Sequence, residues 1–393
     1  MSIPLGETLW GAVRPAALPP TPLAVIHQAV SPPMLDGAVK PANPHGYLDS
    51  AADIAHSLAL TGYPVITPAA RPLAEVDRDW AFPDTSVGLS EALSAGAGLI
   101  WANTSLFGDH PLGGLSDRTD LRVVGQRLRT VEEQENKRTC HLLCRAEGLA
   151  VPGQVVVDLG EDANATGTAI RRALAGAVGW DGPQASMVVK PLRGRGSEGV
   201  RLVSSVEEAA EHVETLLGVR TEIGAGRTAP RFGTRFLLEQ YLPGSEWTVT
   251  VMPAGQYRLP GGTAVHRPWA LPPVARIGHR AGVLPYSGTV PVARNSHVEQ
   301  DVHGLRDILR MCEAVAERMA VSAPIRIDCR QDEQGSVRAF DINLKPNMTG
   351  PGRPGRDGMV NLVGMAAESI GWTYADLLTA VADNAVPIHV ITR

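Results

Sequence analysis

The chain has 393 residues, with 36 basic and 41 acidic side chains and a net charge of -5. At roughly 150 residues per domain, this length favours two or three packed units. The 41 glycines, the 31 prolines and a hydrophobic share of 44% are ordinary for globular proteins and exclude disordered or collagen-like chains. Because the acidic and basic residues are not gathered in long blocks, the sequence predicts neither a nucleic-acid partner nor a membrane surface as partner.

No stretch approaches the roughly 18 apolar residues of a membrane-spanning helix. Residues 1–30 hold several prolines and lack the apolar core of a signal peptide. We therefore expect a cytoplasmic protein. The cysteines show no Cys-x-x-Cys spacing and are interpreted as reduced thiols; they are Cys140, Cys144, Cys312 and Cys329.

Lysine is scarce in this chain. Among the 36 basic residues, the lysines are Lys40, Lys137, Lys190 and Lys345. A compact, flexible ammonium group can do things that a planar guanidinium group cannot. These positions are therefore candidates for functional roles.

The first third of the chain alternates strand-like and helical segments. Apolar runs predict strands at Leu23–Val30, Tyr63–Thr67 and Gly98–Ala102. Ser50–Thr61 shows helical spacing of its apolar residues. This alternation favours an α/β unit with a parallel sheet. The loop Ser31–Tyr47 follows the first strand, where open α/β sheets usually bind ligands; a solvated connector is the alternative.

The later elements follow the same kinds of pattern. In chain order they are a strand at Leu121–Gly125, a helix at Glu132–Gly148, strands at Val151–Val157, Met187–Lys190 and Val200–Val203, a helix at Val206–Leu217 and a C-terminal helix at Tyr374–Val381. We expect three units, at residues 1–130, 131–234 and 235–393. The second begins with the strand near residue 151 and its preceding helix, and the third opens near Arg235.

A glycine-rich segment runs from Lys190 to Val200. Its glycines allow backbone amides to approach an anion, Ser197 adds a hydroxyl donor, and Lys190 stands at the entry as a point charge for phosphate. The segment leads into a strand, whereas a P-loop or a dinucleotide fingerprint leads into a helix. It therefore favours a flexible hairpin lid, with an ordinary turn as the alternative.

The segment Phe236–Glu246 is an apolar strand that ends in polar residues and a Pro-Gly turn. The backbone groups of Tyr241 and Leu242 could face the edge of a flat base beside Glu239. An ionised carboxylate only accepts hydrogen bonds, so Glu246 would suit two ribose hydroxyls. The alternative is a strand end with two solvated glutamates.

Two segments with period-two alternation, 325–330 and 338–343, flank a polar turn. A hairpin centred on that turn places Asp328 opposite Asp341 and Arg326 opposite Asn343, all on one face. Opposed carboxylates repel each other, and Asp and Asn are poor strand residues. Magnesium takes one or two carboxylates together with substrate phosphates. We therefore predict a metal site at Asp328, Asp341 and Asn343, with a solvent-facing polar hairpin as the alternative.

The opposite face of the hairpin is predicted to belong to the core. Its residues are Ile325, Ile327, Cys329, Phe340, Ile342 and Leu344.

With these three segments in this order, the chain resembles the ATP-grasp superfamily, and its motifs are most similar to the D-alanine:D-alanine ligase branch. The resemblance covers roughly residues 135–381. It implies an α/β fold with α+β elements in three domains. These are an N-terminal parallel-sheet domain on the substrate side, a small central lid domain and a larger C-terminal domain with the magnesium site.

The resemblance also implies roles for matching residues. Lys137 and Lys190 would contact the nucleotide phosphates. Arg326 would stabilise the oxyanion of a tetrahedral intermediate. The hairpin would hold Mg²⁺, with two ions expected and Mn²⁺ as an alternative, and Asp341 stands where the family commonly has glutamate. The nucleotide-contacting set is Lys137, Lys190, Arg195, Gly196, Ser197, Gly199, Glu239, Gln240, Tyr241, Leu242 and Glu246.

The implied reaction is ATP-dependent activation of a carboxylate as an acyl phosphate, followed by attack of an amine to form an amide. The expected partners are small-molecule carboxylate and amine substrates, amino acids in particular, and a homodimer is a possible assembly.

The substrate end departs from the cell-wall ligases. Ser31–Pro33 replaces their glycine, serine and acidic pattern, and a glycine- and arginine-rich stretch follows Thr349. A biosynthetic amino-acid ligase is therefore preferred over a cell-wall enzyme. Candidates for binding a substrate carboxylate are Lys345, Arg353 and Arg356, and more weakly Lys40, His266 and Arg267.

Three other functions are alternatives. Authentic D-alanine:D-alanine ligase activity is the nearest alternative. A regulatory ATP-binding protein has no physical need for Arg326 beside the metal ligands. A dehydrogenase would need a glycine-rich turn that opens a helix after the first strand, and Ser31–Pro33 does not supply one.

Overall fold

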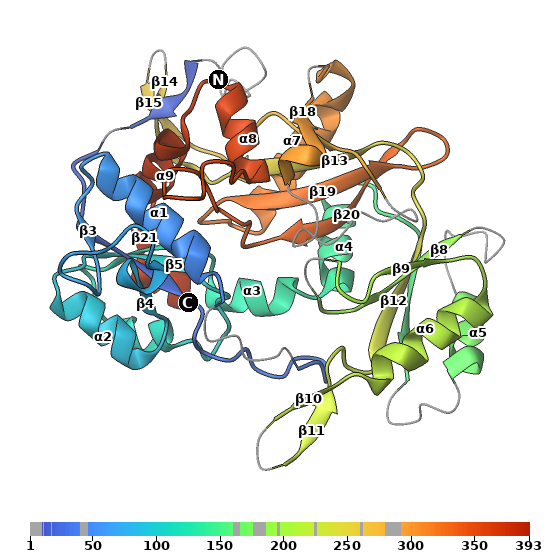
Figure 1. Ribbon diagram of the computed structural model, residues 1–393. Helices are drawn as coiled ribbons and strands as arrows, with labels where there is room; N and C mark the ends of the chain where they lie inside the picture. Colours follow the sequence, from blue (N-terminus) through green and yellow to red (C-terminus); the bar gives the residue numbers. More distant parts are fainter. Residues whose placement is uncertain are drawn as a thin grey trace.

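The protein is represented by a computed structural model (Figure 1), which describes residues 10, 12–16, 18–39, 46–159, 166–175, 186–194, 197–223, 226–259, 262–279, 292–299 and 301–393. Its larger sheets form three parts, which the ribbon shows mainly in blue to cyan, in green to yellow-green, and in yellow to red, and the red β21 joins the first of them. Lys40, Arg195 and Gly196 lie outside the described residues.

The N-terminal part is a sheet whose described strands run in the order β21-β6-β5-β2-β3, with β4 also paired to β2. The strands are β2 (Leu23–His27), β3 (Val65–Ile66), β4 (Ala81–Pro83), β5 (Leu99–Asn103), β6 (Arg122–Val124) and β21 (Val386–Pro387). All pairings are parallel except that of β21. The parallel sheet expected for the first third is therefore confirmed, and the end of the chain completes it.

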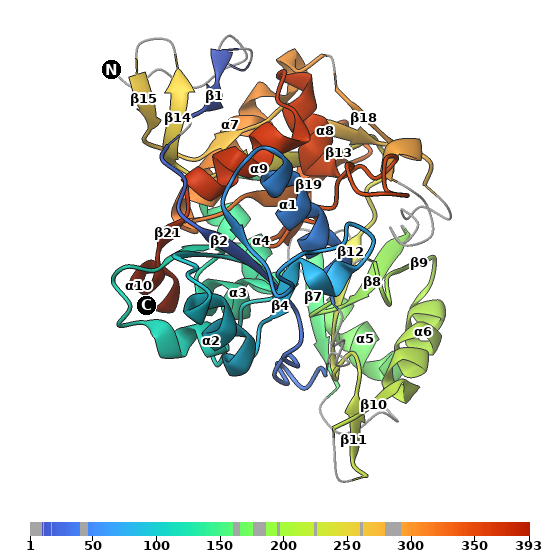
Figure 2. The ribbon, with the colours of Figure 1, turned by 60° about the vertical axis from the view of Figure 1, so that its left-hand side comes forward.

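Helices cover this sheet, namely α1 (Leu48–Leu60), α2 (Ser86–Ser94) and α10 (Ile388–Thr392), with 3-10 turns η2 (Asp77–Asp79) and η3 (Pro111–Leu115). Figure 2 shows α1 lying between the sheet and a helix of the C-terminal part. The residues that gave α1 its helical spacing, Ala51, Ile54, Ala55 and Leu58, are all fully buried. The predicted helix and its inward face are therefore confirmed.

Strand β2 ends at His27, three residues earlier than predicted. The carboxylate of Asp84 accepts hydrogen bonds from the backbone amides of Ala29 and Val30, both at 2.7 Å. These amides are therefore satisfied by a side chain instead of a neighbouring strand. Ala29 and Val30 are apolar and fit a strand pattern in sequence. Because their amides bond to the Asp84 carboxylate, the strand does not continue past His27.

The central part is an antiparallel sheet in the order β7-β12-β8-β9. Its elements are β7 (Gln154–Asp158), β8 (Met187–Pro191), β9 (Arg201–Val203), β12 (Arg235–Gln240), α5 (Thr166–Ala175), α6 (Val206–Gly218) and the ribbon of β10 (Arg220–Glu222) and β11 (Thr228–Pro230). It has its own hydrophobic cluster, which includes Ile170, Val213 and Phe236. Because β12 pairs with β7 and β8, this sheet continues past residue 234, and the exact unit boundaries stay a prediction.

The third part contains a sheet in the order β18-β17-β13-β19-β20, with β16 on β13. Its elements are β13 (Glu246–Met252), β16 (Trp269–Ala270), β17 (Val274–Arg276), β18 (Ser296–Val298), β19 (Ile325–Gln331), β20 (Val337–Asn343), η5 (Val292–Arg294), η6 (His303–Leu305), α7 (Arg306–Arg318), α8 (Leu362–Ser369) and α9 (Tyr374–Asp383). A small sheet of β1 (Arg14–Pro15), β14 (Gly255–Leu259) and β15 (Gly262–Val265) lies beside it. The core of this part is continuous with that of the N-terminal part.

The hairpin of β19 and β20 has the predicted register where the polar residues lie. Arg326 pairs with Asn343 and Asp328 with Asp341, and a bulge then shifts the register so that Cys329 faces Ala339. The prediction that Phe340 belongs to the core is therefore wrong. Ala339 takes the buried place at 1% exposure, and Phe340 lines the cavity described below, because a bulge places two residues against one.

The single helix predicted over Glu132–Gly148 is two helices, α3 (Leu128–Gln134) and α4 (Lys137–Ala146). Asn136 lies at the break, and its side-chain oxygen accepts from the amides of Arg138 and Thr139. An asparagine in the N-cap position satisfies amides that begin a new helix. The break places Lys137 in the first turn of α4.

Replacing Asn136 by alanine is expected to lower the free energy of unfolding by about 1 kcal/mol, because the N-cap of α4 is lost. Urea denaturation would measure the change. Asn136→Ser is the control, since serine keeps a capping oxygen but loses the hydrogen bond from Asn136 Nδ2 to Asp36. Equal stability of wild type and the alanine variant would contradict the capping role.

The described helices include none that is long and apolar enough to cross a bilayer. All four cysteines are free thiols in buried positions, as predicted. Burial raises the pKa of Cys144 to about 12, so this thiol stays protonated at neutral pH.

Candidate active site

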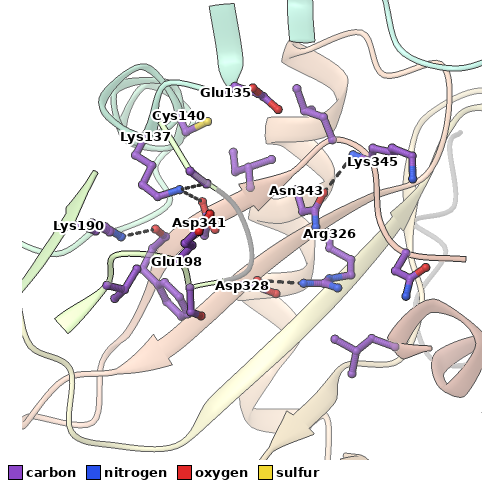
Figure 3. A pocket seen from close by; sticks show the side chains of 18 of the residues that line it. Glu135, Lys137, Cys140, Lys190, Glu198, Arg326, Asp328, Asp341, Asn343 and Lys345 are labelled. Atoms are coloured by element: carbon purple, nitrogen blue, oxygen red, sulfur yellow. Dashed lines mark hydrogen bonds and ion pairs between the residues drawn. The ribbon is translucent and has the colours of Figure 1, made fainter. Parts of the chain in front are cut away.

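A cavity of about 1000 Å³ lies where the three parts meet. Figure 3 shows its centre, with side chains from the start of α4, from β8 and from the hairpin of β19 and β20 pointing inward. Among the predicted site residues that the structure describes, those that line the cavity are Lys137, Lys190, Ser197, Glu239, Gln240, Tyr241, Leu242, Glu246, Arg326, Asp328, Asp341 and Asn343. Gly199 does not line it, but its φ of +74° and the close approach of Pro191 leave room for glycine alone.

The polar face of the hairpin forms one wall of the cavity. Asp328 Oδ1 accepts from Thr248 Oγ1 at 2.7 Å, and its other oxygen accepts from Arg326 Nη2 at 3.2 Å. Asn343 Oδ1 accepts from the backbone amide of Lys345 at 3.1 Å. The predicted metal ligands and the predicted oxyanion arginine are thus held on one surface.

Asp341 lies between cationic groups. Its Oδ1 is 3.4 Å from Lys137 Nζ, which also donates to the carbonyl of Gly194 at 3.0 Å. Burial would raise the pKa of Asp341, but the charges of Lys137 and Lys190 outweigh it and hold this pKa below the ordinary value. The pKa of Lys137 is raised, since the nearby Asp341 outweighs its burial. Both groups are therefore charged at neutral pH.

Lys190 connects the central sheet to the hairpin. Its Nζ lies 2.6 Å from Glu239 Oε2 and donates to the carbonyl of Phe340 at 3.2 Å. The bulge that displaces Phe340 supplies this carbonyl, and His141 Nε2 lies 3.1 Å from it. Burial lowers the pKa of His141. A buried ammonium group thus stands at the mouth of the glycine-rich segment.

Glu246 lines the cavity from the start of β13, next to β19. Its Oε2 is 2.8 Å from His279 Nε2 and 3.7 Å from Arg330 Nη1. The Arg330 guanidinium also stacks over the ring of Tyr241, with its carbon 5.1 Å from the ring centre. These contacts fix Glu246 next to the strand end that was predicted to hold a base.

Within the described residues, some buried polar atoms beside the cavity make no hydrogen bond, namely Glu239 Oε1, Arg276 Nε and Arg326 Nε. Glu239 Oε1 does lie 3.5 Å from His141 Nε2. A buried polar atom without a partner is costly, so such atoms point to a polar ligand. Glu239 Oε1 could accept from the amino group of a base, and the guanidinium groups could donate to phosphate or carboxylate oxygens. The residues present therefore fit a nucleotide with an anionic substrate.

The hairpin offers two carboxylates and an amide oxygen, which are hard donors of the kind that Mg²⁺ prefers. Among the described residues, no group of three or more His, Cys, Asp and Glu side chains is arranged for a metal ion. Protein donors alone are therefore few, and phosphate oxygens would have to complete the coordination. This donor set fits magnesium held together with a nucleotide.

Sequence reasoning missed two residues that support the predicted ones. Thr248, which holds Asp328, lies on the same face of β13 as Glu246, and the alternation Glu-Trp-Thr-Val-Thr could have identified it. Arg276 pairs with Glu246 across β13 and β17 and lines the cavity, and no local pattern indicates it. Burial lowers the pKa of Arg276, which still leaves it charged.

The candidates for binding a substrate carboxylate separate clearly. Arg353 Nε and Arg356 Nε both donate to Asp53, at 2.8 and 2.7 Å, so the expectation that they clamp a substrate is wrong. His266 and Arg267 are exposed and do not line the cavity. Lys345 does line it.

No protein-family model matches the sequence. Among curated proteins, the chain is 25% identical over 209 residues to D-alanine–D-alanine ligases from Pseudomonas putida and Pseudomonas entomophila. Each match covers 51% of this chain and 52% of the relative, so the chain matches about half the length of these curated relatives.

Solved structures match over more of the chain. A D-alanine–D-alanine ligase from Bacillus anthracis complexed with ATP has a TM-score of 0.58 at 16% identity and is matched over 92% of this chain and 96% of its own. The D-Ala:D-Ser ligase VanG from Enterococcus faecalis has a TM-score of 0.60 at 13% identity, over 92% and 98% of the two chains.

The fold is therefore the three-domain α/β fold of ATP-grasp ligases. Within that class the chain resembles the D-alanine:D-alanine ligase branch, and the resemblance inferred from the sequence motifs is confirmed.

Proposed function

We propose that the protein is an ADP-forming, ATP-dependent ligase that joins a carboxylate to an amine as an amide. One observation carries the proposal. Two buried lysines, the opposed pair Asp328 and Asp341, and Arg326 converge on one cavity in an ATP-grasp fold. Positive charge for a phosphoryl group, oxygen donors for a metal and a fixed cation for an oxyanion are the groups that carboxylate activation needs.

Each residue has a distinct task in this reaction. Lys137 and Lys190 would bind phosphate oxygens and neutralise the charge of the transferring γ-phosphoryl group. Glu239 and the backbone of Tyr241 and Leu242 would bind adenine, and Glu246 would accept from the ribose hydroxyls. Ser197, with the rest of the glycine-rich segment, would cover the phosphates and exclude water.

Asp328, Asp341 and Asn343 would hold Mg²⁺, with two ions expected and Mn²⁺ as an alternative. When bound, the metal supplies Lewis-acid stabilisation of phosphate charge. Arg326 lies beside Asp328 at 3.2 Å, where its guanidinium can donate to the oxygen that becomes negative when the amine attacks the acyl phosphate. The chain thus contributes positioning and fixed charge.

The proposed substrates are amino acids in a biosynthetic pathway for a small peptide-like product. The departures at Ser31–Pro33 and in the stretch after Thr349 support this over cell-wall synthesis. That stretch is joined to α1 by hydrogen bonds to Asp53 from the backbone amide of Gly350 and from the side chains of Arg353 and Arg356, and these contacts support a substrate side unlike the sequence pattern of the cell-wall ligases.

The test is phosphate release from Mg-ATP with single and paired L- and D-amino acids and other small carboxylates, followed by mass spectrometry. A ligase gives ADP and an amide only when both substrates are present. Nucleotide binding without phosphate release across the whole panel would favour a regulatory ATP-binding protein instead.

Authentic D-alanine:D-alanine ligase activity is the second candidate, because the matched curated proteins carry that name. It predicts phosphate release and dialanine formation with D-alanine as the sole substrate. A product that requires two different substrates would reject it.

A further inference from the structure

A tight turn lies in the loop after β2. Leu35 and Ala38 exchange backbone hydrogen bonds of 3.2 and 2.9 Å, and the residues between them, Asp36 and Gly37, have φ values of +51° and +74°. Type I′ turns need positive φ at both central residues, and Asp-Gly is among their favoured pairs. The turn therefore presents the side chain of Asp36 at its tip.

This turn follows a strand of the N-terminal part but packs against the central part. The backbone amide of Val39 donates to the carbonyl of Pro230, the last residue of β11, at 3.3 Å. A Cβ added at Gly233 would lie only 2.9 Å from the carbonyl oxygen of Asp36. Figure 1 shows this blue segment next to the ribbon of β10 and β11. The close backbone approach fixes what the Asp36 carboxylate can reach.

Asp36 joins three separate segments of the chain. Its Oδ2 accepts from Arg193 Nε and, at 3.0 Å, from Asn136 Nδ2, and its Oδ1 accepts from Arg235 Nη1 at 3.1 Å. Burial would raise the pKa of Asp36, but the hydrogen bond and the charge of Arg193 outweigh it and hold this pKa below its ordinary value of 3.8. The carboxylate is therefore charged at neutral pH, which strengthens each of these hydrogen bonds.

Each partner of Asp36 lies on an element that also carries a residue with a proposed task in nucleotide binding. The partner and the nucleotide-side residue are Arg193 and Lys190 at the entry to the glycine-rich segment, Asn136 and Lys137 at the start of α4, and Arg235 and Glu239 on β12. Asp36 itself does not line the cavity, whereas Arg193 does. We propose that Asp36 is a positioning residue for nucleotide binding, which holds these three elements in the arrangement that the nucleotide needs.

The charges explain why loss of this carboxylate should be felt in the cavity. Asp36 lies between the guanidinium groups of Arg193 and Arg235. Without its negative charge, these like charges repel each other. Because Arg193 opens the glycine-rich segment, we expect the repulsion to move that segment away from the start of α4.

This inference rests on the proposed function, since it concerns the binding of the nucleotide. Calorimetry with Mg-ADP tests it without turnover. Asp36→Asn keeps the size of the side chain and removes its charge, and it is expected to bind Mg-ADP about tenfold more weakly than the wild type, the size of one charge-assisted hydrogen bond. Asp36→Glu keeps the charge and should recover part of this loss.

Asp158→Asn is the matched control. Asp158 Oδ2 lies 3.2 Å from Arg235 Nε, so this carboxylate pairs with one of the same arginines. It belongs to β7, which is in the same sheet as β12, and it does not line the cavity. This variant should therefore bind Mg-ADP as the wild type does.

Hydrogen exchange gives a readout that a purely structural role of Asp36 would not move. In the wild type, saturating Mg-ADP should slow amide exchange both in β8 and in the Leu35–Ala38 turn, because coupling between two sites acts in both directions. In Asp36→Asn, saturating Mg-ADP should slow exchange in β8 and leave the turn unchanged. The measurement on the wild type needs no variant to fold.

Three results would overturn the proposal: equal Mg-ADP affinity of Asp36→Asn and the wild type, an equal loss of affinity in Asp158→Asn, or no effect of Mg-ADP on the turn of the wild type. Absence of Mg-ADP binding by the wild type would overturn the proposed function as well. If the affinities and the exchange follow the expectation but phosphate is never released from Mg-ATP with any substrate pair, only the proposed ligase activity fails.

Discussion

Replacing Asp341 by asparagine is expected to reduce ATP turnover about 100- to 1000-fold, the usual effect of losing one preorganised electrostatic group at a reacting centre. Asp341 faces Asp328 across the hairpin and lies 3.4 Å from Lys137. Asparagine keeps the size of the side chain and removes only its charge. The loss should therefore come from metal and phosphate binding, with the fold intact. Asp341→Ala should lose at least as much.

Two measurements check this prediction. Phosphate release with the identified substrate pair reports turnover, and calorimetry with ATP in the presence and absence of Mg²⁺ reports metal-dependent binding without turnover. The variant should lose the gain in nucleotide affinity that Mg²⁺ gives the wild type. Normal turnover in the variant would show that Asp341 is not part of the active site.

The control for this experiment lies in the same hairpin. Asp332 is buried in the turn, where it accepts from Arg338 Nε at 2.7 Å and from the amide of Ser336 at 2.8 Å, and it does not line the cavity. Asp332→Asn should lower stability and leave the magnesium dependence of nucleotide binding unchanged. The pair of variants thus separates damage to the hairpin from loss of the metal ligand.

The hairpin also shows what a sequence can specify. Period-two alternation around a polar turn predicted that Asp328 faces Asp341, because register in a hairpin follows from the turn and the pattern. The bulge that moves Phe340 into the cavity was not predictable from that pattern. The unpaired residue is fixed by contacts from elsewhere, including the bond from Lys190 to its carbonyl.

Helix capping explains why the single helix predicted over residues 132–148 is two helices in the structure. Residues 132–148 have a continuous helical pattern, yet Asn136 interrupts it, and an asparagine inside a helical pattern can be read as an N-cap as well as an interior residue. Its bond to Asp36 in the N-terminal part helps decide between the two. Tertiary contacts of this kind are invisible in a single sequence without an alignment.

The segments proposed to bind nucleotide and metal were recognisable in the sequence because each is short and has its own spacing, and the structure brings them to one cavity. The substrate side was not recognisable, because it is built from residues far apart in the chain. Asp53 and Arg353 are separated by 300 residues, and Arg276 carries no local signal. Arg353 and Arg356, in a glycine-rich stretch, are candidates for a substrate by sequence, whereas the structure holds both in an ion-pair cluster with Asp53, with Arg353 buried and Arg356 half-buried.

Asp53→Ala is expected to lower the free energy of unfolding by about 3 to 5 kcal/mol, the usual cost of removing one partner from a buried ion pair. Asp53 is fully buried in α1 and accepts from Arg353 Nε at 2.8 Å, from Arg356 Nε at 2.7 Å and from Thr349 Oγ1 at 2.7 Å. Arg353 is only 2% exposed. Without Asp53, the charge of Arg353 would stay buried with much of its compensation lost.

Urea denaturation of wild type and variant measures the effect, and a double variant tests its cause. Replacing Asp53 by asparagine and Arg353 by methionine together removes both charges, so the double variant should lose less stability than the sum of the two single changes. Strictly additive losses would show that the ion pair contributes nothing beyond packing.

The pH dependence gives an independent check. Burial would raise the pKa of Asp53, but hydrogen bonds from Arg356, Thr349 and Arg353 outweigh it and hold this pKa below its ordinary value of 3.8. A carboxylate with a depressed folded-state pKa contributes stability above the unfolded pKa, and this contribution is lost as the pH falls through the folded value. The stability difference between wild type and Asp53→Asn should therefore be full at neutral pH and shrink below about pH 4. If this stability difference stayed constant on acidification, the charge of Asp53 would not be what holds the stretch after Thr349 against α1.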